Sequence, residues 1–332
     1  MKNRQWLLAR RPQGAIQDSD FNFVETDAPT PREGEVLVRN LMLSCDPTQR
    51  GWIAFDTYLP AVKIGEVIRS IGAGRIVASN NPGFAVGDIV SGLTGWQDYV
   101  AMNPKGQLNK LPPGAPLELA MSALGLTGVT AYFGLLEVGR PVAGETVVVS
   151  GAAGATGSVV GQIAKIKGCH AIGIAGGAEK CHWLTGEAGF DAAIDYKSED
   201  VPARLRELCP KGIDIFFDNV GGDILDAALA RLAMRGRVVL CGGIANYNAT
   251  EPPPGPKNYL NLIVQRGRME GFIVLDYIPR AAEAIRALAG WVQAGKLKNK
   301  VDVQDGLENA PATLRRLFEG RNEGKQLLRV AD

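Results

Sequence analysis

The sequence has 332 residues, of which 46% are hydrophobic, and its 36 Lys and Arg nearly balance its 35 Asp and Glu. A chain of this length has room for two domains of ordinary size that need no metal or disulfide for stability. A formal net charge of +1 provides no field that would attract nucleic acid or an anionic membrane, so we expect neither as a partner.

The sequence offers little that is typical of secretion, membrane insertion or metal binding. Its longest apolar stretches are shorter than the roughly 18 residues of a membrane-spanning helix, so we expect neither a membrane segment nor a secretory one. Its two histidines, His170 and His182, lie outside C-x-x-C and H-E-x-x-H patterns, so we expect no zinc site and metal-free chemistry. Its five cysteines are odd in number and scattered, which favours reduced thiols in a cytoplasmic protein.

Residues 1 to about 122 consist of short β-branched runs separated by proline and glycine, with little helical periodicity. This pattern predicts an all-β, barrel-like unit. The expected strands are Glu35–Arg39, Gly74–Ala78, Asp88–Ser91 and Asp98–Ala101.

From Gly144 to about Val274, apolar strands alternate with helical stretches. The expected strands cover residues 145–150, 170–175, 192–196, 212–217 and 237–241, and the expected helices cover 155–167, 178–188, 201–208 and 223–233. Strands that are apolar throughout and alternate with helices indicate right-handed βαβ crossovers. The sequence therefore predicts a doubly wound parallel sheet, which makes the fold class α/β. Beyond it we expect helices at 278–294 and 307–319, and strands at 300–303 and 325–330.

The sharpest local signal is the glycine-rich run from Gly151 to Gly157, which lies where an apolar strand gives way to a helix. Gly154 lets the backbone approach a diphosphate, and Gly157 allows the helix to pack closely on the strand. The N–H groups of residues 155–157 would meet the phosphates at the positive end of the helix dipole. Ala152 occupies the first glycine position of G-x-G-x-x-G, yet the strand-to-helix context favours a dinucleotide site.

The residues after the second strand favour NADP(H) over NAD(H). No acid stands at the tip of that strand, where a carboxylate would accept the ribose hydroxyls, and Lys180 follows shortly after. An ammonium group would attract a 2′-phosphate, although a solvated helix lysine is the alternative and Glu179 keeps NAD open. Two later strands end in Asn219 and in Cys241–Gly243, which places them at the same cleft, although turn chemistry alone also explains them.

Nine segments distributed over nearly the whole chain carry a family resemblance. They are Leu43–Gly51, Gly95–Tyr99, Gly128–Tyr132, Gly154–Gly157, Ala175–Cys181, Asp218–Gly222, Cys241–Asn248, Gly271–Val274 and Gly320–Lys325. Together they resemble the zinc-independent medium-chain dehydrogenases/reductases, in the branch of leukotriene B4 dehydrogenase/prostaglandin reductases, plant alkenal double-bond reductases and bacterial curcumin reductase. The zinc-dependent branch would need a Cys-His pair where this chain has Cys45-Asp46.

The resemblance implies a GroES-like β-barrel catalytic domain in residues 1–124 and a Rossmann-type NADP-binding domain in residues 125–274. It implies that the segment 275–332 returns to the catalytic domain. It also implies NADPH-dependent reduction of the C=C bond of α,β-unsaturated ketones and aldehydes. The implied partners are NADPH and a small enone or alkenal, and a homodimer is expected by analogy with relatives.

The resemblance also assigns site residues by position. Lys180 would contact the 2′-phosphate and Tyr196 the adenosine. The residues implied around the diphosphate, ribose and nicotinamide are Thr130, Gly154, Ala155, Thr156, Gly157, Asn219, Cys241, Gly242, Gly243, Ile244, Tyr247, Phe272, Ile273, Val274 and Asn322. Asp46, Thr48 and Tyr58 would border the substrate pocket. Relatives commonly read Asp-Pro-Tyr-Met-Arg where this chain has Thr48 and Gln49, so a pocket aromatic is missing that Tyr58 or Trp52 could replace.

Reduction of an enone places negative charge on the carbonyl oxygen, so the protein needs a hydrogen-bond donor aimed at that oxygen. Tyr247 is the candidate donor, and packing against the adenine or against the loop 252–256 is its alternative role. Two other functions remain open from the sequence: a quinone oxidoreductase that uses the same hydride, and a non-catalytic NADPH-binding protein.

Overall fold

The computed structural model describes residues 1–331, which divide into two compact units. Unit 1 comprises residues 1–121 and 301–331, and unit 2 comprises residues 122–300. The sequence assigned the whole segment 275–332 to the first domain, whereas residues 275–300 belong to unit 2. The reason is helix α9 (Ala281–Gln293), in which the Trp291 ring lies 6.1 Å from that of Tyr132 in helix α3 (Leu126–Phe133).

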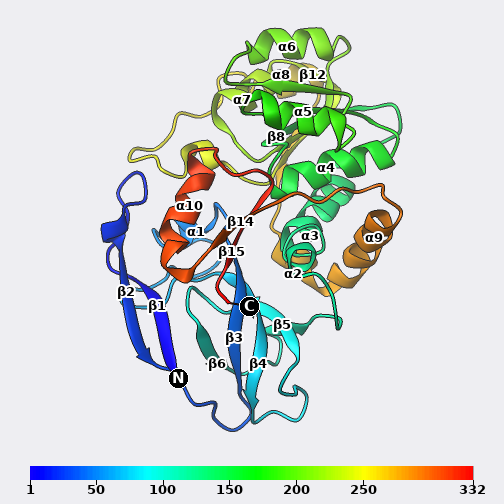
Figure 1. Ribbon diagram of the computed structural model, residues 1–332. Helices are drawn as coiled ribbons and strands as arrows, with labels where there is room; N and C mark the ends of the chain where they lie inside the picture. The colour runs from blue at the N-terminus through cyan, green and yellow to red at the C-terminus, as the bar shows by residue number, and fades with distance from the viewer. Residues whose placement is uncertain (332) are drawn as a thin grey trace. The chain divides into compact units, whose positions relative to one another are not determined.

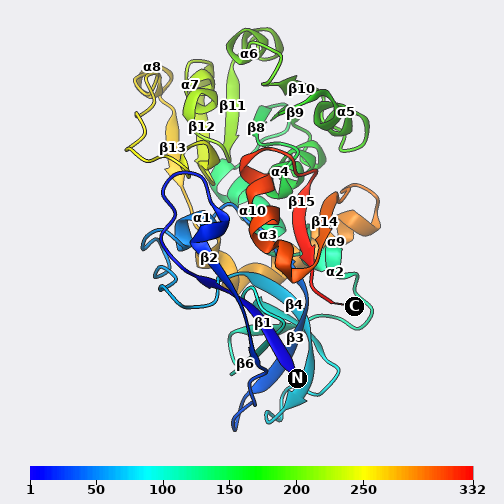
Figure 2. The same ribbon diagram turned by 60° about the vertical axis from the view of Figure 1, so that its left-hand side comes forward.

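Unit 2 contains a six-stranded parallel sheet in the order β10-β9-β8-β11-β12-β13 (Figure 2). Its strands are β8 (Thr146–Ser150), β9 (His170–Ala175), β10 (Ala192–Asp195), β11 (Ile213–Asp218), β12 (Leu232–Leu240) and β13 (Arg268–Gly271). The predicted doubly wound sheet is confirmed. Because β8 is followed by β9 on one side and has β11 on the other, the strand order reverses between β8 and β11. Ligands of such sheets bind beyond the carboxyl ends of the strands at this reversal.

Helices cover both faces of this sheet. Besides α3 and α9, the helical segments of unit 2 are η2 (a π-helix, Gly134–Gly139), α4 (Ala155–Ile166), α5 (Ala178–Gly186), α6 (Val201–Leu208), α7 (Gly222–Leu229), η3 (Ile244–Asn246), α8 (Asn261–Gln265) and η4 (Val274–Arg280). Successive strand residues point to opposite faces. On β11, Phe216 packs in one cluster with residues of α6 and α7, whereas Phe217 faces η2 and lies 6.3 Å from the Phe272 ring.

The expected helix at 223–233 is too long, because α7 ends at Leu229 and β12 begins at Leu232. Residues 232–235 are Leu-Ala-Met-Arg, all strong helix formers, so local propensity favours the wrong element. Leu232 is buried and pairs with Ile213 of β11, and the strand then bulges where Arg235 adopts a φ of 61°. Burial of the side chain in the sheet therefore overrides the propensity.

Unit 1 contains a seven-stranded sheet with the path β14-β15-β3-β4-β5-β7, with β6 paired to β3, and a separate hairpin of β1 and β2. The strands are β1 (Lys2–Leu8), β2 (Phe21–Asp27), β3 (Val36–Ser44), β4 (Ile71–Ser79), β5 (Ile89–Leu93), β6 (Tyr99–Met102), β7 (Leu108–Lys110), β14 (Val301–Asp305) and β15 (Lys325–Arg329). Its short helices are η1 (Asp18–Asp20), α1 (Gln49–Trp52), α2 (Leu117–Ala120), η5 (Leu307–Asn309) and α10 (Ala310–Phe318). The sequence predicts a sheet-rich first domain but misses the β1–β2 hairpin. Long-range contacts hold this hairpin, among them the Trp6 indole N–H, which donates to the Leu307 carbonyl at 2.8 Å.

The returning strand β15 lies beside β3 (Figure 1). It begins with a buried lysine. Lys325 is only 2% exposed, and its Nζ donates to the Cys45 carbonyl at 2.9 Å and to Asp46 Oδ1 at 2.8 Å. The other Asp46 oxygen accepts from the Ser44 hydroxyl, and the Asp46 N–H donates to Gln49 Oε1 at 2.9 Å. Because a buried ammonium needs a partner, this ion pair fixes the chain between β3 and α1.

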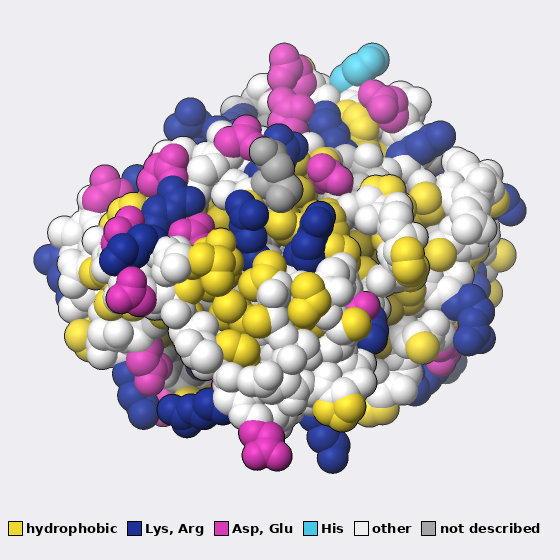
Figure 3. All heavy atoms as spheres, turned by 60° about the horizontal axis from the view of Figure 1, so that its bottom comes forward, with side chains coloured by type: hydrophobic (Ala, Val, Ile, Leu, Met, Phe, Trp, Pro, Cys, Tyr) yellow, Lys and Arg dark blue, Asp and Glu magenta, His cyan; other side chains and the backbone are white. Residues whose placement is uncertain are grey.

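On the face drawn in Figure 3, basic and acidic side chains are interspersed with hydrophobic ones, in keeping with the near-zero net charge. Among residues 1–331, no helix has both the length and the apolar composition that crossing a bilayer requires.

Candidate active site

The glycine-rich turn leads from β8 directly into α4, at the reversal of strand order. The Gly154 N–H donates to the Gly151 carbonyl at 2.9 Å, and Gly151 has a φ of 57°, which favours glycine. Gly154 is the N-cap of α4, and no side chain caps this helix. The first N–H groups of a twelve-residue helix thus point out of the turn with the helix dipole behind them, which fits a diphosphate.

The packing of the turn explains its small residues. A β-carbon on Gly157 would lie 2.4 Å from the Gly151 carbonyl oxygen and 2.9 Å from the Cα of Ala152, so α4 approaches the turn more closely than any side chain permits. Ala152, at the first glycine position, is fully buried against Gly173 of β9, whose missing side chain makes room for the Ala152 methyl group. The alanine is therefore compatible with the turn.

Hydrogen bonds lock the end of β8 to the end of β11. The Ser150 hydroxyl donates to Asp218 Oδ1 at 2.7 Å and accepts from the Asn219 N–H at 2.8 Å. The Asn219 amide donates to the Ser150 carbonyl at 2.7 Å. Asp218 is fully buried, and burial raises the pKa of its carboxyl group, whereas the N–H of Gly221 and the Ser150 hydroxyl oppose this rise. Neither Ser150 nor Asp218 was predicted from the sequence as a site residue, although both end apolar strands at the reversal.

The end of β12 joins the same cluster. The Cys241 N–H donates to the Asp218 carbonyl at 2.9 Å, and the Ile244 N–H donates to the Asn219 carbonyl at 3.3 Å. Burial, with a contribution from Asp218, raises the pKa of the Cys241 thiol to about 12, so this thiol stays protonated near neutral pH. The Tyr247 hydroxyl accepts from the Gly243 N–H at 3.2 Å, which holds the phenol over the two glycines that follow Cys241.

Lys180 and Tyr196 follow β9 and β10 at the same edge of the sheet. Lys180 is half-buried in the first turn of α5, and the Tyr196 ring would be 2.8 Å from a β-carbon on Gly176. An acid is present here after all, but it comes from β10. Asp195 accepts from the Gly177 N–H at 2.7 Å and from the Ser198 hydroxyl at 2.8 Å, and the Gly177 hydrogen bond lowers its pKa.

The other cofactor-side predictions have different surroundings. The Thr130 hydroxyl donates to the Leu126 carbonyl at 2.7 Å within α3. Residues 272–274 follow β13 at the carboxyl edge, where Ile273 is the N-cap of η4 and Val274 begins it. The Phe272 ring would be 2.4 Å from a β-carbon on Gly134, so this side chain packs inward against η2.

Four of the predicted residues belong to unit 1. Asp46 is held by Lys325, and Thr48 lies one residue before α1. The Tyr58 hydroxyl lies 2.9 Å from Thr48 Oγ1, so these two predicted pocket residues are in contact. Asn322 precedes β15, and its amide donates to the Gly324 carbonyl at 2.8 Å.

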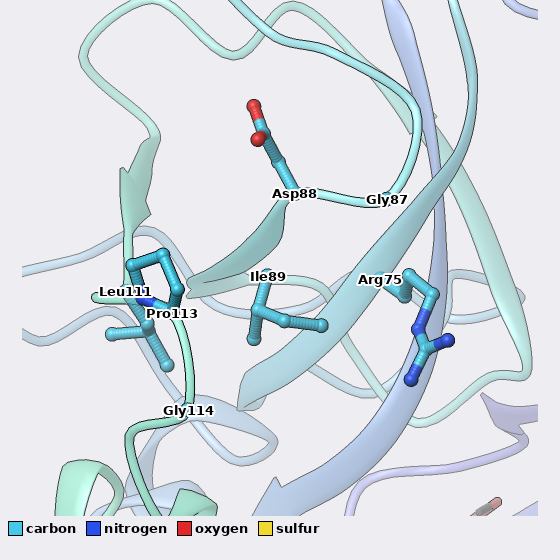
Figure 4. Close-up of a pocket in the computed structure, with 7 residues that line it drawn as sticks. All are labelled: Arg75, Gly87, Asp88, Ile89, Leu111, Pro113 and Gly114. Carbon is cyan, nitrogen blue, oxygen red and sulfur yellow. The ribbon is translucent and has the colours of Figure 1, made fainter.

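A cavity of about 350 Å³ in unit 1 does not coincide with these residues. Figure 4 shows its lining of Arg75, Gly87, Asp88, Ile89, Leu111, Pro113 and Gly114. Asp88 is paired with Lys110 at 2.7 Å, and this contact lowers the pKa of the Asp88 carboxyl group. Within residues 1–331, no group of three or more His, Cys, Asp or Glu is placed to hold a metal ion.

Comparison with protein families finds two matching models. One is described as the N-terminal domain of oxidoreductase and matches residues 4–111, and the other as zinc-binding dehydrogenase and matches residues 155–290. The chain is 44% identical to the NADPH-dependent curcumin reductase of Escherichia coli over 99% of this chain and 97% of the relative. It belongs to the zinc-independent medium-chain dehydrogenases/reductases.

Two further relatives match the chain over nearly its whole length. The NADP+-dependent 2-alkenal reductase of Nicotiana tabacum is 40% identical over 100% of this chain and 98% of its own. The crystal structure of CurA from Vibrio vulnificus in complex with NADPH has a TM-score of 0.94 and 41% identity, and covers 99% of both chains. The family's α/β fold therefore extends over the entire chain.

Gly157→Ala tests the turn. The added methyl group would overlap backbone atoms, so we expect a lower melting temperature and about tenfold weaker NADPH binding, in line with the cost of overpacking. Isothermal titration calorimetry and thermal unfolding measure the two effects. Gly290→Ala is the control: it lies in helix α9 with open space around its Cα and should gain about 0.5–1 kcal/mol. Unchanged NADPH affinity in Gly157→Ala would mean that the diphosphate binds elsewhere.

Proposed function

We propose that this protein reduces the C=C bond of α,β-unsaturated ketones and aldehydes with NADPH. The observation that carries the proposal is the uncapped start of α4, behind a turn too narrow for a side chain at Gly157 and at the reversal of strand order. The supporting comparison is the 44% identity to an NADPH-dependent curcumin reductase. When bound, NADPH supplies the hydride that is added to the β-carbon of the alkene.

The chain's own residues bind and orient the two reactants. The N–H groups at the start of α4 bind the diphosphate, and Asn219 with Cys241–Ile244 forms the wall beside it. Backbone groups and residues at the ends of strands make up most of this wall. It therefore holds the nicotinamide ring of NADPH in one orientation.

Tyr247 is the proposed donor to the carbonyl oxygen of the enone. Its hydroxyl accepts from the Gly243 N–H at 3.2 Å, and an O–H group that accepts a hydrogen bond becomes a stronger donor. A phenol held in this way stabilises charge that develops on the oxygen without reorganising.

Lys180 is proposed to bind the 2′-phosphate of NADPH. It lies in the first turn of α5, at the carboxyl edge of the sheet, where phosphate recognition is expected. The nearby Asp195 carboxylate is engaged by the Gly177 N–H, the Lys197 N–H and the Ser198 hydroxyl. Its oxygens are thus directed to the protein rather than to the ribose hydroxyls that NAD would offer.

We also propose a homodimer that forms through β13, which is an edge strand of its sheet. Next to it, α8 exposes apolar side chains, among them Ile263 at 74% and Val264 at 61%. Antiparallel pairing of β13 with its own copy around Met269 would place Arg268 opposite Glu270, which makes the strand self-complementary in charge.

The scattered and unpaired cysteines support a cytoplasmic location.

The function is tested by steady-state oxidation of NADPH with three kinds of acceptor: 2-alkenals, enones and benzoquinones. We expect efficient turnover with alkenals and enones, and identification of the saturated carbonyl product by mass spectrometry. Turnover with quinones alone would favour the quinone oxidoreductase alternative. Tight NADPH binding without oxidation by any acceptor would instead indicate a non-catalytic protein.

Lys180→Ala should raise the KM for NADPH by about tenfold or more, the range expected for loss of a charge-assisted hydrogen bond. The KM for NADH should change little, because NADH has no 2′-phosphate. Lys211→Ala is the matched control, since this exposed lysine precedes β11 at the opposite edge of the sheet. Equal losses for the two cofactors would place the adenosine end elsewhere.

Tyr247→Phe should lower kcat with enones by about tenfold and leave the KM for NADPH nearly unchanged, because the lost hydroxyl acts on charge that develops in the transition state. Tyr259→Phe removes a hydroxyl from an exposed tyrosine and serves as the control. A kcat equal to that of the wild type would assign Tyr247 to packing.

Ile263→Glu should convert the dimer into a monomer, because it places a charge in the apolar part of the proposed interface beside β13. Size-exclusion chromatography with light scattering measures the mass. Val142→Glu, at a position 63% exposed in the same unit, should leave the mass unchanged. A wild-type protein that is already monomeric at micromolar concentration would refute the dimer.

A further inference from the structure

Two arginines, Arg39 of β3 and Arg75 of β4, lie directly opposite each other in the antiparallel sheet of unit 1. The next pair along these strands, Val38 and Ile76, is buried in a core cluster. Because successive residues of a strand point to opposite faces, both arginine side chains point to the other face, where both are exposed. The β-carbons of such a pair are about 4.5–5.5 Å apart, so one ligand can contact both guanidinium groups.

The positive charge of this pair has no counter-charge within the part of the chain that the structure describes. Over residues 1–331, neither guanidinium group forms a hydrogen bond or an ion pair. Asp88 is near Arg75, but its carboxylate is bound by Lys110 at 2.7 Å, and Figure 4 shows it directed away from the Arg75 guanidinium. Like charges directly opposite each other destabilise a sheet, and an anion bound to both groups would remove this cost.

The cavity of about 350 Å³ described above lies beside Arg75 and is mostly apolar on its other side. Ile89 of β5 pairs with Arg75, so the two side chains share one face of the sheet. Figure 4 shows Ile89 between Arg75 and the side chains of Leu111 and Pro113. A volume of this size is in the range of pockets that hold small ligands.

Hydrogen bonds and packing hold the walls of this cavity in place. The Leu111 N–H donates to the Ile89 carbonyl at 2.8 Å, and the Leu111 side chain packs against a cluster that contains the buried Met42. The Gly87 N–H donates to the Ile76 carbonyl at 2.8 Å, which fixes the turn before β5. A ligand that enters a cavity formed in advance loses little affinity to ordering of the protein.

We propose that Arg39, Arg75 and this cavity form a binding site for a small carboxylate that carries an apolar chain or ring. The planar guanidinium groups match the geometry of the carboxylate, and the apolar part of the ligand contacts Ile89, Leu111 and Pro113. All residues of the site belong to unit 1, and none is a residue proposed above to act in reduction. The site is therefore independent of the proposed function.

Isothermal titration calorimetry with 4-phenylbutanoate tests the site. We expect a Kd of about 1 mM or tighter, as is usual for a ligand of this size. Two partial ligands, acetate without the apolar part and 4-phenylbutanamide without the charge, should each bind about fivefold or more weakly. An amide that binds as tightly as the carboxylate would refute the role of the arginines. Acetate of equal affinity would refute the role of the cavity, and no binding at about 10 mM 4-phenylbutanoate would overturn the proposal.

Arg39→Gln and Arg75→Gln should each weaken binding of 4-phenylbutanoate by about fivefold to tenfold, the effect of losing one charge-assisted hydrogen bond. Binding of the amide should stay within about twofold of the wild type in both variants. Arg32→Gln is the matched control, because it removes the same group from an exposed position that precedes β3. Wild-type affinity in Arg75→Gln would place the ligand elsewhere on the protein and contradict the proposal.

Nuclear magnetic resonance locates the ligand directly. In protein with ¹³C-labelled isoleucine methyl groups, the Ile89 signal is identified by its loss in Ile89→Val. Saturating 4-phenylbutanoate should shift this signal in the wild type and in Arg32→Gln, and the same concentration should shift it less in Arg75→Gln. An Ile89 signal that stays in place while calorimetry reports binding would refute the site.

The stability of the ligand-free protein is a further readout. Arg75→Gln should raise the melting temperature by about 1–3 °C at low ionic strength, because it removes the repulsion from Arg39. High salt should reduce this gain, since exposed charges are screened. Arg32→Gln should show no such gain. An Arg75→Gln variant with the melting temperature of the wild type at low salt would show that the two guanidinium groups do not approach each other, which the proposed site requires.

Discussion

The hydrogen bonds among Ser150, Asp218 and Asn219 determine the geometry of the cofactor edge. They join the carboxyl end of β8 to that of β11, and the Asp218 carbonyl then accepts the Cys241 N–H of the segment after β12. Because Asp218 is fully buried, its carboxyl group must keep the hydrogen bonds that it accepts from the Ser150 hydroxyl and the Gly221 N–H. A shift of β8 against β11 would break the first of these bonds. This cluster therefore fixes the positions of the glycine turn, the Asn219 amide and the loop that carries Tyr247.

Structural features that depend on residues close together in the sequence could be predicted. The turn from Gly151 to Gly157 follows an apolar strand and opens a helix, so its neighbours in sequence already predict its conformation. The strand-helix alternation of unit 2 is equally local. Ser150 and Asp218 gave no such signal, because they are 68 residues apart and neither polar side chain is unusual at a strand end. Only the fold brings them together.

At residues 232–235, burial of side chains in the sheet outweighs the local preference for a helix. Leu232 to Arg235 would form a helix in isolation, yet Leu232 gains more from the sheet beside Ile213. The segment 275–300 was assigned by resemblance to the returning chain, although the Trp291 and Tyr132 rings pack within unit 2. Asp195 was missed because it reaches Gly177 from the neighbouring strand, where a rule based on spacing after β9 does not look.

The glycine turn in unit 2 and the loop after α1 in unit 1 are stabilised by different kinds of contact. The glycine turn presents backbone N–H groups and depends on glycines at a strand end, so side-chain substitutions elsewhere leave its shape intact. The loop after α1 is held by side chains: Arg11 binds the Ile53 and Val62 carbonyls, and Arg69 binds the Pro60 carbonyl. The Lys325–Asp46 pair fixes the chain that leads into α1. The shape of the glycine turn is therefore determined by how the strands pack, whereas the side chains that the loop exposes, such as Phe55 and Tyr58, are determined by its own sequence.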